Sequence, residues 1–244
     1  MKKILHPSSS RGYANHGWLE ARHTFSFAGY HNPARTHFGV LRVLNDDIVA
    51  GGRGFGTHPH DNMEIVTILL EGAIEHRDSM GTTGIIRAGD VQVMSAGTGV
   101  EHSEVNPLPT EATNLLQIWV FTDRLGHTPR YDQRSFAAAE RQGTWQYLVA
   151  PDMPGALAIH QQAWFARTEL APGQSLTYTP GRQGNGVYAF LIKGKATLAG
   201  ETLGPRDGLA IQEATELTAT GIERSDLLLL DVPMELPDYL HRAA

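Results

Sequence analysis

The apolar residues of this chain fall into short runs separated by turn-forming residues. Phe38–Leu44 is followed by Asn-Asp-Asp, Glu64–Leu70 by Glu-Gly, and Leu115–Phe121 by Thr-Asp. Such runs, rich in β-branched and aromatic residues and bounded by Gly, Asn and Asp, predict strands. Helical periodicity is weak throughout. The pattern therefore predicts an all-β sandwich or barrel rather than alternating β–α units.

The second half of the chain also consists of short apolar runs separated by turn-forming residues. Ala73–Asp78, in the first half, is more polar, and we expect it to be the solvated partner of the preceding strand in a hairpin. Ser135–Glu140 predicts a turn or two of helix, and Asp238–Arg242 a short terminal helix. Further strands are expected at Trp164–Leu170, Ser175–Tyr178, Val187–Ile192, Lys195–Leu198, Gly208–Ile211, Glu216–Ala219 and Leu227–Val232.

An internal echo indicates two copies of one β-domain. Glu64–Gly72 and Val187–Gly194 are each an apolar strand, a charged residue and a glycine, and a second short strand and a Gly-Asp or Asp-Gly pair follow each of them. The chain turns polar near Pro129–Tyr131, after the long strand that ends at Phe121. We therefore expect an N-terminal domain over residues 1–130 and a C-terminal domain over residues 131–244.

Composition narrows the possible functions. The chain has 244 residues and no cysteine, which excludes disulfides, thiolate metal sites and a catalytic thiol. Its net charge is −6 and no basic block occurs, so nucleic acid is not an expected partner. No apolar stretch approaches the ~18 residues of a membrane span, and no signal-peptide core follows the first residues. We expect a cytoplasmic protein.

Two short segments place some of the twelve histidines in a ligand-like pattern. His58 and His60 follow a glycine-rich loop, and His102 and Glu104 follow a second one. Residues i and i+2 of a strand point to the same face, so each pair can aim at one point. Three imidazoles and one carboxylate suit Fe, Mn, Co, Ni, Cu or Zn better than Ca or Mg. Strand parity leaves Glu64 open as an alternative carboxylate, because it is six residues from His58.

These segments resemble those of the pirins, a branch of the bicupins, and in particular bacterial pirin-like proteins with quercetin 2,3-dioxygenase activity. Gly52, His58, His60 and Glu64 fit the cupin pattern, although Gly72 comes one residue late. The second cupin pattern fits less well, because Ser95 replaces a common proline and His102 comes two residues late. The pirin-like run Ser-Ala-Gly-Thr-Gly-x-x-His-Ser-Glu fits Ser95–Glu104 directly. Further similarity lies in His16–Trp18, Thr24–Phe27, Val40–Asp46 and Thr128–Tyr131.

The resemblance implies two cupin domains of jelly-roll type, each a β-barrel. The N-terminal domain would hold one divalent transition metal per chain through His58, His60, His102 and Glu104. Iron is favoured, and Mn, Co, Ni, Cu and Zn fit the same ligands. Glu104 is preferred to Glu64 because the pirin-like match is the closer one, which leaves Glu64 as a buried acid near the site. The C-terminal domain has no His-x-His pair, and we expect it to be metal-free.

The implied activity is cleavage of a flavonol such as quercetin by O2, giving a depside and carbon monoxide, with Glu104 as general base. The alternative is a metal-binding regulatory or interaction protein without essential catalysis. We expect a monomer whose partners are a flavonol and O2. The histidines at 76, 127, 160 and 241 are expected at the surface or as satisfied core groups, while those at 16, 23, 31 and 37 could rim the site. The loop Gly51–Gly56 lacks the Gly-Lys-Ser/Thr ending of a phosphate loop.

Overall fold

Antiparallel strands are the main regular elements of the computed structural model, which describes residues 1–241. The only helical elements in that range are two 3₁₀ turns, η1 (Ser8–Ser10) and η2 (Ala138–Arg141), and one short α-helix, α1 (Asp238–His241). The predicted all-β class is confirmed. Within residues 1–241, no helix has the length and apolar character needed to span a bilayer.

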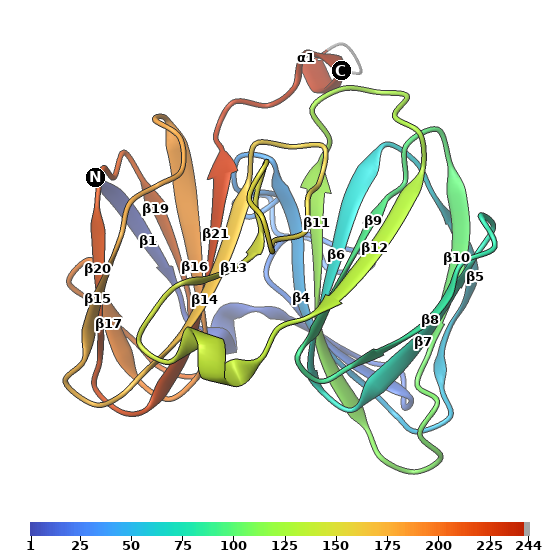
Figure 1. Ribbon diagram of the computed structural model, residues 1–244, viewed down its shortest axis with the longest axis horizontal. Helices are drawn as coiled ribbons and strands as arrows, with labels where there is room; N and C mark the ends of the chain where they lie inside the picture. Colours follow the sequence, from blue (N-terminus) through green and yellow to red (C-terminus); the bar gives the residue numbers. More distant parts are fainter. Residues whose placement is uncertain (242–244) are drawn as a thin grey trace. The chain divides into compact units, whose positions relative to one another are not determined.

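Contacts between Cα atoms divide the chain into two units. The N-terminal unit consists of residues 12–136 with 159–161 and the segment that starts at 236, and the C-terminal unit of residues 1–11, 137–158 and 162–235. In Figure 1 the strands of the C-terminal unit run from yellow to red, except for dark blue β1, which lies beside β19. The predicted boundary between residues 130 and 131 remains a proposal. It concerns the point in the sequence where the first copy of the repeat ends and the second begins.

The N-terminal unit contains two sheets. The seven-stranded sheet has the order β12-β9-β6-β11-β4-β3-β2 and the four-stranded sheet the order β5-β10-β7-β8. Their strands are β2 (Gly12–Asn15), β3 (Leu19–His23), β4 (Leu41–Val49), β5 (Gly54–His60), β6 (Met63–Glu71), β7 (Ala73–Asp78), β8 (Thr83–Arg87), β9 (Asp90–Ser95), β10 (Val100–Val105), β11 (Thr113–Phe121) and β12 (Arg130–Ser135).

The C-terminal unit also contains two sheets, with orders β1-β19-β16-β21-β14-β13 and β15-β20-β17-β18. Their strands are β1 (Lys2–His6), β13 (Gln146–Val149), β14 (Trp164–Leu170), β15 (Ser175–Tyr178), β16 (Asn185–Lys193), β17 (Ala196–Leu198), β18 (Glu201–Leu203), β19 (Gly208–Gln212), β20 (Leu217–Gly221) and β21 (Ser225–Pro233).

The two units repeat one topology. The small sheets match strand for strand, with β5-β10-β7-β8 corresponding to β15-β20-β17-β18. In the large sheets β9-β6-β11-β4 corresponds to β19-β16-β21-β14, so β6 and β16 are the two strands of the sequence echo. The internal repeat predicted from these strands is confirmed. The edge position that β12 holds in one unit is held in the other by β1, from the start of the chain.

Each unit buries apolar side chains between its two sheets. In the N-terminal unit Leu69 and Leu115 of the large sheet cluster with Ile74 and Ile86 of the small one, all four at most 1% exposed. The C-terminal unit has a larger cluster, in which Leu227 and Leu229 of β21 meet Leu217 and Ala219 of β20. Burying a side chain of this size contributes about 1.5–3 kcal/mol. The cores therefore hold the sheets face to face.

Three local predictions differ from the structure. The Asn45-Asp46-Asp47 segment, which reads as a turn, lies inside strand β4, with all three residues buried. Strand β7 pairs with β8 and β10 rather than with the preceding strand β6, and it is mostly buried. Residues 130–135, which read as a polar connector, form β12 against β9. In each case a partner distant in sequence supplies the pairing that the local composition does not suggest.

The helix predictions are partly right. The predicted turn over Ser135–Glu140 begins later, as the 3₁₀ helix η2, because Ser135 still belongs to β12. The terminal helix is confirmed over Asp238–His241. The last residue of that prediction, Arg242, lies outside the described residues.

A buried carboxylate organises the interior of the C-terminal unit. Asp231 is fully buried on β21, and its Oδ2 accepts hydrogen bonds from Tyr178 Oη at 2.9 Å and from the Gly181 amide at 2.7 Å. Its Oδ1 accepts a third, from Asn185 Nδ2 at 2.7 Å. Burial raises the pKa of Asp231 above its ordinary value, and the donors around it act in the opposite direction. One side chain thus ties β15 and the loop before β16 to β21.

Asp231→Ala should destabilise the protein by about 3 kcal/mol or more, because it leaves three donors without their acceptor, at about 1–3 kcal/mol each when buried. Urea unfolding followed by tryptophan fluorescence measures this loss. Glu216→Ala, at an exposed position of the same unit, is the matched control and should change stability by less than about 0.5 kcal/mol. Equal midpoints for the two variants would contradict this role of Asp231.

Candidate metal centre

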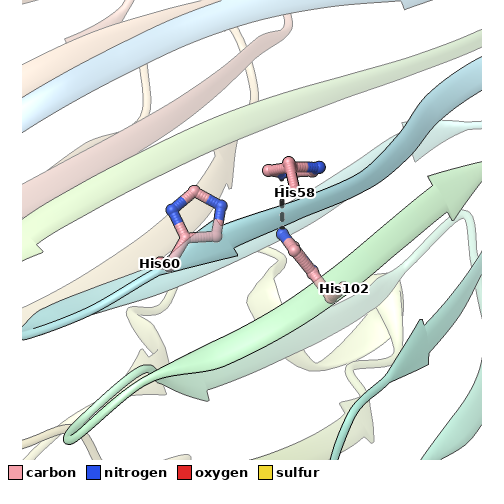
Figure 2. Close-up of side chains that lie close together, drawn as sticks. All are labelled: His58, His60 and His102. Atoms are coloured by element: carbon pink, nitrogen blue, oxygen red, sulfur yellow. Dashed lines mark hydrogen bonds between the residues drawn. The ribbon is translucent and has the colours of Figure 1, made fainter.

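Three histidines meet on two neighbouring strands of the small N-terminal sheet. Figure 2 shows His58 and His60 on β5 and His102 on β10, with their rings turned toward one another. The centroids of the three rings are 4.4–4.9 Å apart. The Nε2 atoms of His58 and His102 are separated by 3.0 Å. The structure therefore brings together the three histidines that the sequence singles out.

The β5–β10 pairing is irregular next to these histidines. His102 lies opposite His58, whereas Glu104 lies opposite Phe55, so β5 contains one more residue than β10 in this interval, a β-bulge. Such bulges re-aim side chains and are frequent next to active sites. The strands approach so closely that a Cβ on Gly54 would lie 2.1 Å from the Glu104 carbonyl oxygen. Glycine at position 54 is therefore a steric requirement of this pairing.

The bulge also fixes the orientation of the His58 ring. Its Nδ1 lies 2.7 Å from the Gly56 carbonyl oxygen, which can only accept a hydrogen bond. Nδ1 therefore carries the proton, and in the neutral ring Nε2 presents a lone pair toward His102. A backbone acceptor of this kind is the usual partner of a metal-binding imidazole.

Burial keeps two of the rings neutral. Desolvation, with a contribution from nearby His58, lowers the pKa of His60 to about 4. Desolvation and the three neighbouring histidines lower the pKa of His102 to about 2. Neutral imidazole is the form that binds a metal ion. At neutral pH these two rings can therefore bind a cation without first losing a proton.

Glu104 follows His102 on β10 and is 2% exposed. Its Oε2 accepts a hydrogen bond from Gln117 Nε2 at 3.1 Å, and its Oε1 is buried without a hydrogen-bond partner. Burial raises the pKa of Glu104 to about 7, with the side chains of Gln117 and Thr67 acting in the opposite direction. The ligand atoms of Glu104, His102 and His76 lie within 4.8 Å of one another, a second group that shares His102 with the three-histidine group.

The alternative carboxylate, Glu64, points elsewhere. It is fully buried on β6, and its Oε2 accepts a hydrogen bond from Ser95 Oγ at 2.6 Å. The next residue, Ile65, lines the cavity beside the histidines, and successive side chains of a strand face opposite ways. Parity across His58–Glu64 fails because β5 ends at His60 and Asn62 adopts a φ of +45° before β6 begins.

Behind His102 lies a buried histidine–carboxylate pair. His76 is fully buried on β7, and its Nδ1 is 3.4 Å from the Nδ1 of His102. On its other side, His76 Nε2 donates to Asp78 Oδ2 at 2.9 Å, and Tyr131 packs against its ring. Burial lowers the pKa of His76. The sequence predicts His76 either at the surface or as a core group with its hydrogen bonds satisfied. His76 is a core group, and it also contacts His102, a predicted ligand.

The histidines line a cavity of about 250 Å³ between the two sheets of the N-terminal unit. Trp119 packs edge-on against His60 and against Phe27, with ring centroids 4.9 and 5.3 Å apart. Phe55 stands beside His58 at 6.3 Å. The remaining polar lining comes from the large sheet, through Asn45, Asp47 and Gln117.

Sequence reasoning missed most of this lining, although a signal was present for part of it. Gln117 interrupts an otherwise apolar strand, and Asn45 and Asp47 extend one. Polar residues buried within a strand need partners, so they mark a polar interior. No comparable signal identifies Phe27 and Phe55, since only the tertiary fold brings them to the histidines.

This donor set fits a transition-metal ion. A pair of imidazole nitrogens 3.0 Å apart, a third ring beside them and an unpartnered carboxylate oxygen nearby are the ligands that Fe, Co, Ni, Cu and Zn accept. A cation among them would also supply the missing partner of Glu104 Oε1. The cavity beyond leaves space for a small molecule to reach the same point.

Comparison with protein families agrees with both halves of the chain. The family description "Pirin" matches residues 5–120, and "Quercetinase C-terminal cupin domain" matches residues 147–232. These matches confirm the two predicted cupin domains.

Relatives match nearly the whole chain. A protein of Escherichia coli named quercetin 2,3-dioxygenase is 43% identical over 230 residues, covering 94% of this chain and 98% of its own. A pirin-like protein of Caulobacter vibrioides is 40% identical over 227 residues, covering 92% and 97%. The crystal structure of the bacterial pirin YhhW from Escherichia coli in complex with nickel(II) superposes with a TM-score of 0.90 at 42% identity, covering 95% and 99%. The chain belongs to the pirin family.

Proposed function

We propose that this protein is a metal-dependent dioxygenase that cleaves a flavonol such as quercetin. One divalent ion would be held by His58, His60, His102 and Glu104. The observation that carries the proposal is the convergence of three imidazoles beside a buried carboxylate oxygen without a partner, at the end of an aromatic-walled cavity. The names of the relatives and the nickel in the related pirin structure support it.

A bound ion would supply a Lewis acid that favours ionisation of the flavonol 3-hydroxyl and redox chemistry for the reaction with O2. The protein's side chains do the rest. Glu104 takes the hydroxyl proton as general base, and the Gln117 amide keeps its other oxygen in place. Trp119, Phe27 and Phe55 pack against the flat rings and keep water away from the reacting carbon atoms.

The overall reaction balances without a further reductant or oxidant. Both atoms of O2 enter the product, at the carbons that were C2 and C4 of the central ring. The bonds from C3 to these carbons break, and C3 leaves with its own oxygen as carbon monoxide. The remaining skeleton is the depside, an ester of two aromatic acid fragments. Iron is the proposed ion, and nickel is the obvious one to test beside it, given the related structure.

We propose that the C-terminal unit holds no ion. Strand β15 ends at Tyr178 as β5 ends at His60, and β20 begins at Leu217 as β10 begins at Val100, with the same cross-strand pairing. This alignment puts Leu176, Tyr178 and Ala219 at the places of His58, His60 and His102. All three pack in or against the apolar core, and the Tyr178 hydroxyl is bonded to Asp231.

Replacing any one of His58, His60 or His102 by Ala should lower the bound metal from one ion per chain to a small fraction, because each change removes a coordinating nitrogen. Glu104→Gln should weaken metal binding and abolish turnover. Elemental analysis of washed protein and calorimetric titration with Ni²⁺ measure both effects. Two tightly held ions per chain would contradict the proposed single site.

Glu64→Gln is the matched control for the carboxylate assignment. It keeps the size and burial of the side chain, and Glu64 faces away from the cavity. Metal content should therefore stay near one ion per chain. If Glu64→Gln emptied the site while Glu104→Gln left it full, the assignment would be wrong.

Asp78→Asn should weaken Ni²⁺ binding by about 10–100-fold, the usual effect of disturbing a group that orients a metal ligand. The amide keeps an oxygen for the amides of Met80 and Thr82 but cannot accept from His76 Nε2. His76 then loses the tautomer that accepts the Nδ1 proton of His102. Glu75→Gln, on the same strand, should leave the affinity unchanged, and equal affinities for both variants would refute this role.

Metal-loaded protein mixed with quercetin without oxygen should shift the flavonol absorption to longer wavelength, because the 3-hydroxyl ionises on binding a cation. Oxygen should then bleach the band and release carbon monoxide, measured by gas chromatography. The His102→Ala variant should do neither. Flavones without the 3-hydroxyl should not react.

A spectral shift without oxygen consumption under Fe, Mn, Co, Ni and Cu alike would favour a metal-dependent binding protein over an enzyme. Equal bleaching by the His102→Ala variant would show ordinary autoxidation instead.

A further inference from the structure

A second cavity of about 610 Å³ lies in the N-terminal unit beside the first. The β2–β3 hairpin, at the edge of the seven-stranded sheet, forms one side of it, and the turn Phe27–Tyr30 forms the other. We call it the outer chamber. Its aromatic lining residues are Tyr13, Trp18, Phe27, Tyr30 and Phe55.

The outer chamber adjoins the metal cavity. Phe27 and Phe55 line both spaces, so each presents part of its side chain to the histidines and part to the chamber. Each is held by a second ring on one side, because Phe27 packs edge-on against Trp119 and Phe55 edge-on against Trp18, at 5.1 Å. A flat molecule passing between Phe27 and Phe55 would therefore meet aromatic surface along its length.

The metal cavity alone is small for a three-ring substrate. Pockets that enclose molecules of this size have volumes of about 300–1,000 Å³, and the metal cavity has 250 Å³. The metal cavity and the outer chamber together fall within that range. A substrate whose hydroxyl reaches the histidines thus needs space beyond the metal cavity, and the outer chamber is a space that adjoins it.

The chemistry of the chamber selects an aromatic occupant. Its polar lining consists of the phenols of Tyr13 and Tyr30 and the imidazoles of His16 and His23, and no acidic or arginine side chain of residues 1–241 lines it. Ring faces and edges bind other rings by offset or edge-to-face packing, and phenols and imidazoles exchange hydrogen bonds with hydroxyls.

We propose that the outer chamber is the binding site for the aryl substituent of a 2-aryl-3-hydroxy-4-pyranone whose hydroxy-ketone part lies at the histidines. The inference rests on the proposed function and names the part of the substrate that this chain selects. A phenyl ring with one or more hydroxyls fits the mixed aromatic and hydrogen-bonding lining. The chamber then discriminates flavonols from smaller hydroxypyranones that bind the same ion.

Filling the chamber tests the proposal without touching the metal ligands. Ala14→Trp places an indole on the chamber wall, and Gly29→Leu adds a side chain where a Cβ would meet no atom within 4 Å. Glu20→Trp is the matched control, because Glu20 is exposed and points away from the face of β3 that lines the chamber through Leu19, Ala21 and His23. The unmodified protein and the three variants are loaded with Ni²⁺ and titrated without oxygen. Each is titrated once with quercetin and once with a 3-hydroxy-4-pyranone that has no aryl group.

Both filled variants should raise the Kd for quercetin by about tenfold or more, the scale on which a pocket discriminates by size, and leave the Kd for the pyranone within twofold. Glu20→Trp should change neither. Unchanged quercetin affinity in both filled variants would overturn the proposal. So would equal losses for the two compounds, or unmodified protein that binds both with the same affinity.

The proposed reaction can fail separately from the chamber. Protein that binds quercetin selectively but consumes no oxygen would contradict the dioxygenase and still support the chamber. Unmodified protein that shifts the spectrum of neither compound would overturn both.

Discussion

The pairing of β5 with β10 is the constraint on which the metal centre depends. Alternation along these two paired strands puts the side chains of His58, His60, His102 and Glu104 along one cavity, and the register of the pairing shifts between His102 and Glu104. That shift needs the two backbones in contact at Gly54, where any side chain would collide with the Glu104 carbonyl. The large sheet of the same unit lines the opposite side of the cavity.

Burying so many polar groups between two sheets is costly unless each has a partner. The structure meets that cost by local bonds, with Gly56 for His58, Gln117 for Glu104 and Asp78 for His76. Glu104 Oε1 is left without a hydrogen-bond partner beside the histidines, as are Asn45 Oδ1 and Trp119 Nε1 in the same cavity lining. A buried carboxylate oxygen without a donor, next to neutral imidazoles, is what a bound cation would satisfy.

The two units show what one topology does with different side chains. Where the N-terminal unit has histidines between its sheets, the C-terminal unit has leucine, alanine and a tyrosine bonded to Asp231. The small sheets and the four shared strands of the large sheets follow the same order in both units. The proposed metal site therefore depends on a few side chains on one copy of the fold and not on the fold itself.

The sequence by itself determined the all-β class, the repeat and the three histidines, because alternation along a strand and i, i+2 spacing are local properties that survive any choice of partner strand. The tertiary structure decided everything that depends on which strands pair. Strand β7 pairs with β10 and not with its sequence neighbour β6, which brings His76 next to His102. Asn45 and Asp47 lie within β4 because β3 and β11 pair with that strand on its two sides. Glu64 faces away from the histidines because the chain turns at Asn62 and resets the alternation. Local patterns fix the direction of a side chain within its own strand, whereas its neighbours come from residues tens of positions away.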